Sequence, residues 1–554
     1  MKSLFIRADA GGKTGTGHVM RMLALAQAYQ RRGGRVVFIC AKIPEALEAR
    51  LIQEGCEVLR ISVKPGSAED AQATLAVVRG QGAGGRKQEA ADGDQQAGDR
   101  GQEAISHPIS DIPYPISHIP YPNSSEAHLQ PEGRISQLPY PHHQWLIVDG
   151  YHFDYAYQKA IKACGLSLLC VDDHGYTDQW CCDAILNQNL DAEKHMQYDN
   201  EITSFTPLLG ASFCLLRQEF LQPKKPAQAW SQIHQSLITL GGSDPDNATE
   251  AVLRLLNQAS QRPLHIRVLA GADNPHVSRL RAFESHHQIE VLQNTTNMPE
   301  QYAWADGIIS AGGSTCWEWL YYGLPGAVVS IAENQLPIIN ALAETRQAAL
   351  SLGWFNEAQF KNQALALARW LETPAEICDV EVTQGLIDGY GPDRVADFLL
   401  GSKVTVREAR REDCAQYLVW ANNPEVRKNS FSPDVISEAS HVKWFSKRIG
   451  APDCCLLVVS DFAGNAVGQV RFDFNEDKGG WVIDFSIDSR WRGRGLGKAS
   501  LTEALNWMHH NHPNQLVVFA EVLELNPASK KIFEALEFKI TSTYDHFTSY
   551  SLAL

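Results

Sequence analysis

The residues best suited to chemistry lie first in a glycine-rich segment near the start of the chain. A strand-like run ends at Asp9, and a loop with Gly11, Gly12, Gly15 and Gly17 leads to His18, where a helix is expected to begin. Glycines allow close backbone approach, and a helix N-terminus offers free N–H groups to an anion. A histidine there titrates near neutrality and can take a proton from water. His18 is therefore a candidate general base, the alternative being a histidine that only caps or packs.

A second group of polar residues follows two strand-like runs in the middle of the chain. Six members would place amides, hydroxyls or a carboxylate near helix starts: Gly242, Ser243, Gly313, Ser314, Thr315 and Glu318. Asn334 and Gln335 would complete a polar rim. Amides and hydroxyls at a helix N-terminus suit a diphosphate. Glu318, one turn inside the helix, can accept both hydroxyls of a ribose. Each glycine pair taken alone is equally consistent with an ordinary strand-to-helix turn.

A third candidate is the R-x-x-G-x-G loop in the last quarter of the chain. It follows the strand-like FSID and leads into a helix: Arg492, Gly493, Arg494, Gly495, Gly497 and Lys498. Consecutive N–H groups beside arginines form a nest for a pyrophosphate. Farther along, Asn526 ends a strand and Ser529 opens a helix. The loop alone is equally consistent with a basic turn at a helix start.

Hydrophobic periodicity predicts the elements that position these residues. Short apolar runs alternate with amphipathic stretches to about residue 220 and again over 236–400, which indicates βαβ units and two parallel sheets. The strands expected in the first half are Leu4–Arg7, Val36–Cys40, Leu146–Val148 and Leu168–Val171. The pattern changes after Gly401–Ser402. We expect an α/β chain with Rossmann-like halves at 1–222 and 223–400, and an α+β domain at 401–554.

The segment at about 83–142 departs from this pattern. It is polar and contains the proline-punctuated repeats IPYP, IPYP and LPYP. Such a segment buries too little apolar surface to offset its ordering entropy. We expect a disordered insertion inside the first half; docking to a polyproline-binding partner is the alternative.

Seven ordered segments of residues 1–400 resemble the GT-B nucleotide-sugar enzymes, most closely the UDP-sugar hydrolases of pseudaminic acid biosynthesis. They are RADAGGKTGTGHVMR (7–21), VDGYHFD (148–154), DDHGYTDQWCCDAILNQN (172–189), LLRQEF (215–220), ITLGGSDPDN (238–247), SAGGSTCWEW (310–319) and AENQ (332–335). The resemblance implies inverting hydrolysis of UDP-2,4-diacetamido-2,4,6-trideoxy-β-L-altrose. The resemblance implies that His18 is the base that acts on water and that Gly17 forms the loop beside it. It implies that Gly313 to Thr315 contact the diphosphate and Glu318 the ribose. Asp149, Tyr151 and Asn187 are the implied sugar contacts.

Residues 403–554 resemble the GNAT acetyltransferases through the Arg492–Gly497 loop and the unit VVFAEVLELNPASKKIFEALEF. The resemblance implies that this loop binds the pyrophosphate of acetyl-CoA and that Asn526 contacts the pantetheine. Asp484 and Glu521 are candidates to deprotonate an amine through water. Phe533 is a departure, because many members carry there a tyrosine that protonates the thiolate; Tyr544 and Tyr550 are nearby in sequence.

The stretches LVWANNPEVRKNSF (418–431) and HVKWF (441–445) resemble the acceptor region of the acetyltransferase of the same pathway. That enzyme acetylates UDP-4-amino-4,6-dideoxy-N-acetyl-β-L-altrosamine, and its product is the hydrolase substrate. Small acetyltransferases of this fold often dimerise, so a homodimer through this domain is one expectation. The alternatives are a UDP-N-acetylhexosamine glycosyltransferase fused to a protein acetyltransferase or to a non-catalytic acetyl-CoA sensor.

Composition limits the remaining functions. A net charge of -15 argues against binding to nucleic acid. Neither a secretory signal nor a membrane-spanning apolar run is expected, and the twelve scattered cysteines indicate free thiols in a reducing cytoplasm. Their spacing, without C-x-x-C, predicts no metal site.

Overall fold

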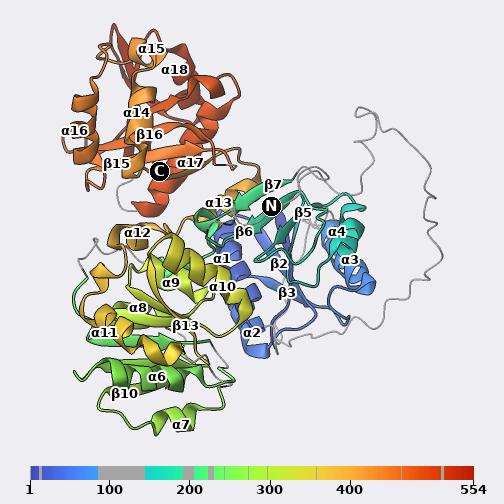
Figure 1. Cartoon of the computed structure of the whole chain (residues 1–554). Helices are drawn as coiled ribbons and strands as arrows, with labels where there is room; N and C mark the ends of the chain where they lie inside the picture. Colours follow the sequence, from blue (N-terminus) through green and yellow to red (C-terminus); the bar gives the residue numbers. More distant parts are fainter. Residues whose placement is uncertain are drawn as a thin grey trace, which may run out of the picture.

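The computed structural model describes residues 2–11, 15–84, 144–190, 192, 205–221, 230–241, 244–271, 274–295, 297–356, 359–462, 464–512 and 517–553. Their strands form three sheets of seven, six and seven strands (Figure 1). Two parallel Rossmann-like sheets precede a mixed sheet, so the predicted fold class is confirmed. The insertion expected at about 83–142 lies outside the described residues, apart from its first two.

The first sheet is parallel throughout, in the order β3-β2-β1-β4-β5-β6-β7. Its strands are β1 Ser3–Ala8, β2 Arg35–Cys40, β3 Glu57–Arg60, β4 Trp145–Asp149, β5 Ser167–Val171, β6 Ala184–Asn187 and β7 Thr206–Leu209. Its helices are α1 Gly17–Arg31, α2 Glu45–Gln53, α3 Ala68–Gly84 and α4 Tyr155–Lys162. Because the order reverses between β1 and β4, the carboxyl ends of these strands frame the crevice where such sheets bind ligands.

The alternation of side chains along β1 explains why helices cover both faces of this sheet. Leu4 and Ile6 belong to the apolar cluster that includes α1, whereas Phe5 belongs to the cluster that includes α3 and α4. Successive residues of a strand point to opposite faces, so an uninterrupted apolar run must be buried on both. Gly33, at φ +76°, follows the C-cap residue Arg32 at the end of α1.

The second sheet is also parallel, in the order β10-β9-β8-β11-β12-β13. Its strands are β8 Gln235–Thr239, β9 His265–Ala270, β10 Gln288–Gln293, β11 Gly307–Ala311, β12 Gly326–Ser330 and β13 Ala349–Trp354. Its helices are α6 Ala248–Ala259, α7 Val277–Arg281, α8 Met298–Trp304, α9 Thr315–Tyr321, α10 Leu336–Asn340, α11 Ala364–Glu372, α12 Val380–Gly385 and α13 Gly391–Leu400.

The third sheet has the order β14-β15-β16-β17-β18-β20-β19 and one parallel pair, β17 with β18. Its strands are β14 Thr405–Glu408, β15 Cys454–Ser460, β16 Ala466–Asn475, β17 Gly480–Ile487, β18 Val517–Leu523, β19 Lys539–Thr543 and β20 Phe547–Ala553. Its helices are α14 Cys414–Ala421, α15 Pro424–Lys428, α16 Glu438–Arg448, α17 Leu496–Asn511 and α18 Pro527–Ala535.

Helix α13 follows the second sheet in sequence but packs against α1 of the first half. Asp393 accepts two hydrogen bonds of 3.0 Å from Arg31 Nη2, and both Asp393 and Asp397 pair with Arg32. The apolar side of α13 joins the core of the first half through Val395. The chain therefore returns to the first half, where α13, the last helix of the second half, packs.

The third sheet also packs against α13, which lies between this domain and the first half in Figure 1. Phe462 places its ring 5.2 Å from that of Phe398. Glu503 of α17 is only 5% exposed and lies beside Asp397. Burial, followed by the adjacent Asp397 carboxylate, raises the pKa of Glu503 to about 9. A protonated carboxyl thus joins the domains at neutral pH.

The raised pKa makes stability depend on pH. Because folded Glu503 keeps a proton that the unfolded chain releases, the corresponding stability is present below about pH 4.5 and declines as pH rises toward 9. A Glu503→Gln variant should lose less stability than the wild type between pH 5 and 9, and should exceed it at pH 8 by several kcal/mol. Urea denaturation between pH 5 and 9 measures the free energy of unfolding of the variant and of the wild type. Glu476→Gln, an exposed change in the β16–β17 turn, is the control and should follow the wild type.

Candidate functional site

The first site lies where β4 ends beside the first turn of α1. His18 Nδ1 is 2.6 Å from Oδ1 of Asp149, the last residue of β4. Arg21, one turn along α1, donates to both oxygens of Asp149 at 2.7 and 2.6 Å. Burial alone would raise the pKa of Asp149, but Arg21 and then His18 reverse this and lower it to about 2. Asp149 is therefore a permanent carboxylate beside the imidazole.

This carboxylate fixes which nitrogen of His18 is available for chemistry. A carboxylate only accepts, so Nδ1 must carry the proton and donate it. The Arg21 guanidinium also lies 3.1 Å from Nδ1, but it is itself a donor and cannot bond to a protonated nitrogen. In the neutral imidazole, Nε2 is then the nitrogen without a proton, as a base requires.

A second carboxylate, Asp173 after β5, extends the site. Arg21 Nη1 donates to Asp173 at 2.6 Å, and the Tyr151 hydroxyl donates to it at 2.8 Å. The Tyr151 ring lies 5.1 Å from that of His18 and 4.6 Å from that of His174. Burial raises and Arg21 lowers the pKa of Asp173, and the result is below the ordinary value. The structure thus brings His18, Asp149 and Tyr151 together.

Sequence reasoning missed Arg21, Asp173 and His174. Arg21 could have been found from its spacing, because a residue three positions after His18 shares the same helix face. Asp173 follows β5, the neighbour of β4, at the edge where parallel strands place ligand-binding groups. Both lie inside segments that carry the family resemblance.

Other predicted residues of the first half surround this centre. Asn187 ends β6, and its Oδ1 accepts from the Asn189 N–H at 3.0 Å. Asn189 in turn donates to the backbone carbonyl of Asp173 at 2.8 Å, which connects Asn187 to the site. Gly17 begins α1, and a Cβ built there would meet nothing within 4 Å.

In the second half, α9 begins at the predicted place, with Gly313, Ser314 and Thr315 at its start. A Cβ on Gly313 would meet nothing within 4 Å, so this backbone is open to a ligand. Gln335 Oε1 accepts from the Ile331 N–H at 3.2 Å at the end of β12. Asn334 lies in the adjoining turn Glu333–Gln335, and Gly242 and Ser243 fall outside the described residues.

Glu318 lies in the first turn of α9, but its carboxylate is already engaged. Tyr302 donates its hydroxyl to Glu318 at 2.7 Å, and Arg217 of the first half lies at 3.5 Å. Burial raises the pKa of Glu318. Binding of a ribose by Glu318 therefore requires exchange of these partners and stays a prediction.

The third sheet opens between β17 and β18. The two strands pair only at Trp481–Val518 and Val482–Phe519 and then diverge. Asp484 and Glu521 each lie two residues beyond the last pair, hence on the same face of the opening. Asp484 keeps 56% of its side chain exposed, and Glu521 pairs with Lys478 at 2.5 Å. The predicted candidates for amine deprotonation therefore flank one gap.

The loop after β17 has the conformation expected of a phosphate nest. Gly493 and Gly495 have φ of +76° and +75°, which favours glycine, and α17 follows at once. Arg494 stacks over Trp491 at 4.9 Å, and Lys498 is exposed in the first turn of α17. Gly497 is needed for helix packing, because a Cβ there would lie 2.7 Å from Ile532.

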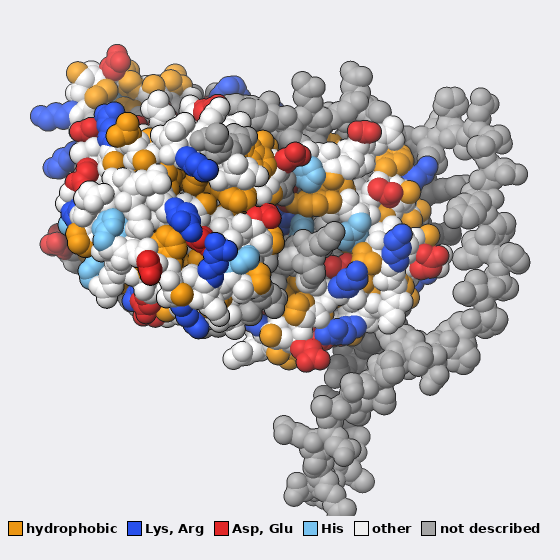
Figure 2. All heavy atoms as spheres, turned by 60° about the horizontal axis from the view of Figure 1, so that its bottom comes forward, with side chains coloured by type: hydrophobic (Ala, Val, Ile, Leu, Met, Phe, Trp, Pro, Cys, Tyr) orange, Lys and Arg blue, Asp and Glu red, His pale blue; other side chains and the backbone are white. Residues whose placement is uncertain are grey.

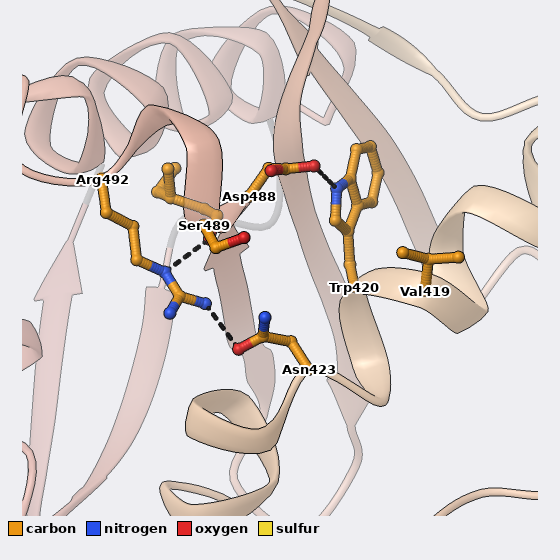
Figure 3. Close-up of a pocket in the computed structure, with 7 residues that line it drawn as sticks. Val419, Trp420, Asn423, Asp488, Ser489 and Arg492 are labelled. Carbon is orange, nitrogen blue, oxygen red and sulfur yellow. Dashed lines mark hydrogen bonds between the residues drawn. The ribbon is translucent and has the colours of Figure 1, made fainter.

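Arg492 points toward Asn423 (Figure 3). Its Nε donates to the Ile487 carbonyl at 2.9 Å, and its Nη2 donates to Asn423 Oδ1 at 3.1 Å. It also pairs with Glu425 of α15. Arg492 thus holds the loop against α15 beside a small pocket lined by Val419, Trp420, Asn423, Ile487, Asp488, Ser489 and Arg492. A direct contact of Arg492 with pyrophosphate stays a prediction.

The residues of α18 take structural roles. Asn526 Oδ1 accepts from the Ser529 N–H at 3.1 Å and caps the helix. Phe533 is 3% exposed, with its ring 5.8 Å from Phe485 and stacked 5.9 Å from Tyr550. Phe533 therefore fills the core at the position where the family resemblance implies a tyrosine.

Comparison with known proteins agrees with this geometry. Residues 403–539 match the family model described as Acetyltransferase (GNAT) domain, and residues 236–349 match Glycosyltransferase family 28 C-terminal domain. The chain fuses a glycosyltransferase-like domain to a GNAT acetyltransferase domain.

Among the described residues, no helix is long and apolar enough to cross a membrane, and no group of three His, Cys, Asp or Glu residues is placed to hold a metal.

Two curated proteins resemble parts of this chain. The chain is 24% identical over 415 residues to "Uncharacterized protein MJ1062" of Methanocaldococcus jannaschii, covering 72% of this chain and 81% of that protein. It is 25% identical over 193 residues to the spore coat polysaccharide biosynthesis protein SpsG of Bacillus subtilis, covering 34% and 57% respectively. The chain thus spans less than two thirds of SpsG.

Two solved structures resemble the GNAT part. A spermidine N-acetyltransferase from Vibrio cholerae in complex with CoA and spermine has 19% identity and a TM-score of 0.26, covering 28% of this chain and 96% of that one. A domain from Methanocaldococcus jannaschii has 21% identity and a TM-score of 0.25, covering 28% and 99%. At these scores the likeness carries no argument about activity.

The buried pairing of Arg21 yields a stability prediction. Arg21→Met leaves Asp149 and Asp173 without their shared cation and should lower the free energy of unfolding at pH 7 by about 3–5 kcal/mol. At pH 4 the deficit should shrink, because the uncompensated carboxyls then take up protons. Denaturation at both pH values tests this. Arg50→Met, which breaks a surface pair with Glu219, should cost less than about 1 kcal/mol at either pH.

Proposed function

We propose that this chain catalyses two consecutive steps on one UDP-linked amino sugar. Acetyl-CoA first acetylates the 4-amino group of UDP-4-amino-4,6-dideoxy-N-acetyl-β-L-altrosamine, and the product is then hydrolysed to UDP and the free 2,4-diacetamido sugar. The sugar's identity rests on the family resemblance of the ordered segments. The likeness to a spore coat polysaccharide biosynthesis protein supports a role in making a surface sugar.

The observation that carries the hydrolase assignment is the 2.6 Å contact between His18 Nδ1 and Asp149. It leaves Nε2 as the base at the edge of the sheet where ligands bind. Water attacks the anomeric carbon and gives its proton to Nε2, while the bond from that carbon to the UDP oxygen breaks and UDP departs. A nucleoside diphosphate is a good leaving group, so positioning and water activation suffice.

The acetyltransferase assignment rests on the GNAT family match and the opening flanked by Asp484 and Glu521. The amine nitrogen attacks the thioester carbonyl, a C–N bond forms and the C–S bond breaks. The amine proton passes through water to Asp484 or Glu521. The thiolate takes a proton from a group other than Phe533, which has none to give. The loop at Gly493–Gly497 would hold the acetyl-CoA pyrophosphate.

A single experiment tests both steps. The full chain is incubated with the UDP-4-amino sugar and acetyl-CoA, without any acceptor, and products are measured by mass spectrometry. We expect CoA, UDP and the free diacetamido sugar in equal amounts. The glycosyltransferase match favours the main alternative, a transferase that needs a sugar or lipid acceptor. In that case the UDP-diacetamido sugar would accumulate uncleaved, and hydrolysis would be excluded.

Two substitutions test the base and its orienting carboxylate. His18→Ala should slow hydrolysis by about 10²–10⁴-fold, and Asp149→Asn by a similar factor because the amide no longer selects the Nδ1–H tautomer. Acetyl transfer by the same preparations should stay at the wild-type rate, which shows that the chain is folded. Asp154→Asn is the matched control, because asparagine caps α4 as well as aspartate does. Wild-type hydrolysis by either site variant would refute the assignment.

A further inference from the structure

Three aromatic side chains of the GNAT domain form an exposed platform, defined here as Phe431, Tyr544 and Phe547. Phe431 lies in the loop after α15, and the other two lie in the hairpin of β19 and β20. The Tyr544 and Phe547 rings stack at 4.5 Å with an interplanar angle of 20°. The Phe431 ring meets that of Phe547 edge-on at 5.6 Å. Phe431 and Tyr544 are nevertheless 60% and 54% exposed. Large aromatic faces left in water in this way indicate a surface that binds something.

The loop that carries Phe431 is held in place from both ends. Arg427 donates to the carbonyls of Ser432 and Asp434 and, through Nη2, to the Ser430 hydroxyl at 3.2 Å. Asn422 exchanges two hydrogen bonds of 2.8 Å with the backbone of Ile436. Phe431 therefore projects from an ordered turn, and its exposure is built into the structure.

The turn that carries Tyr544 is equally defined. The Tyr544 N–H donates to the Phe547 carbonyl at 2.9 Å, which closes the hairpin between β19 and β20. Tyr544, from the same hairpin, and Phe431, from the loop after α15, thus both contact the Phe547 ring. The helices next to these turns, α15 and α18, lie at the same end of the domain (Figure 1).

The platform lies beside the opening between β17 and β18. Phe547 pairs with Leu523, which is two residues beyond Glu521 and on the same face of the sheet. At a rise of about 3.3 Å per residue, Leu523 lies about 7 Å along β18 from Glu521. The platform begins opposite Leu523 on β20 and extends outward through Phe431 and Tyr544. A molecule whose amine enters the opening thus passes its remaining part over these rings.

We propose that this platform binds the pyrimidine base of the UDP-linked amino sugar by stacking, and so selects a nucleotide-bound acceptor. This inference rests on the proposed acetylation of a UDP-sugar. The uracil ring is the flat aromatic group of that acceptor, separated from the amine by the sugar, the diphosphate and the ribose. Stacking on exposed aromatic side chains is a general way to bind a base. A second copy of the chain seated here would instead cover the opening that the acceptor must enter.

Steady-state acetylation by the full chain tests the platform. Tyr544→Ala and Phe431→Ala should each raise KM for the UDP-amino sugar about tenfold or more. The kcat and the KM for acetyl-CoA should remain within about twofold, and Tyr544→Phe should keep wild-type kinetics because stacking needs only the ring. Acetylation of the methyl glycoside of the same amino sugar, which lacks a base, should be unaffected. Ile540→Ala, also exposed at 59% on the neighbouring edge strand, is the matched control.

The possible outcomes separate the platform from the function on which it rests. Wild-type acetylation of the UDP-sugar with unchanged KM in both alanine variants overturns the platform and leaves the acetyltransferase intact. Equal losses on the UDP-sugar and the methyl glycoside also overturn it, because the base would then play no part. A lower mass in solution for Tyr544→Ala, measured by light scattering, would assign the surface to a second copy. Absence of acetyl transfer to the UDP-sugar by the wild type refutes the proposed function and the platform together.

Discussion

The arrangement of the whole molecule depends on the ion pairs that fix α13 against α1. Two arginines of α1 meet two aspartates of α13, so charges that would be costly to bury singly compensate one another. The pairing returns the chain from the second half to the first. The same helix also contacts the GNAT domain: Phe398 meets Phe462, and Asp397, which pairs with Arg32, lies beside Glu503. One helix thus determines the positions of two catalytic domains.

The same principle operates on a smaller scale in the first site. Asp149 is buried and charged, and it is stable there because Arg21 and His18 both contact it. The charge that makes the site costly to build also sets the tautomer of His18. Asp173 shares the guanidinium and fixes Tyr151, so ligand-facing and orienting groups form one network. The same network of contacts around Asp149 therefore stabilises the buried charge and orients the proposed base.

Local patterns in the sequence were sufficient for much of this description. Apolar runs predicted the strands, because a strand covered on both faces needs consecutive apolar residues, and glycines with positive φ marked the turns at Gly33 and Gly493. His18 was found because its chemistry and its place at a helix start coincide in sequence. The contacts of α13 were not predicted, since they join residues more than 350 positions apart that no periodicity connects.

The direction of a long side chain was also beyond sequence reasoning. Arg492 was expected to face the loop that it begins, but the neighbouring Ile487 carbonyl and Asn423 draw it toward α15. Glu318 similarly turns to Tyr302 and Arg217, a partner supplied by the other half. In each case the chosen partner comes from an element distant in the chain. The type of residue indicated the chemistry, whereas packing decided where it points.

The opening between β17 and β18 has a consequence for how the two domains cooperate. It lies toward α15 and α18, at the end of the GNAT domain remote from the two Rossmann-like halves (Figure 1). Under the proposed function, an acetylated sugar nucleotide that leaves this opening enters bulk solvent before it reaches His18. The covalent link therefore fixes the ratio of the two enzymes at one to one. It does not shorten the journey of the intermediate, whose flux follows its concentration in solution as it would for two separate proteins.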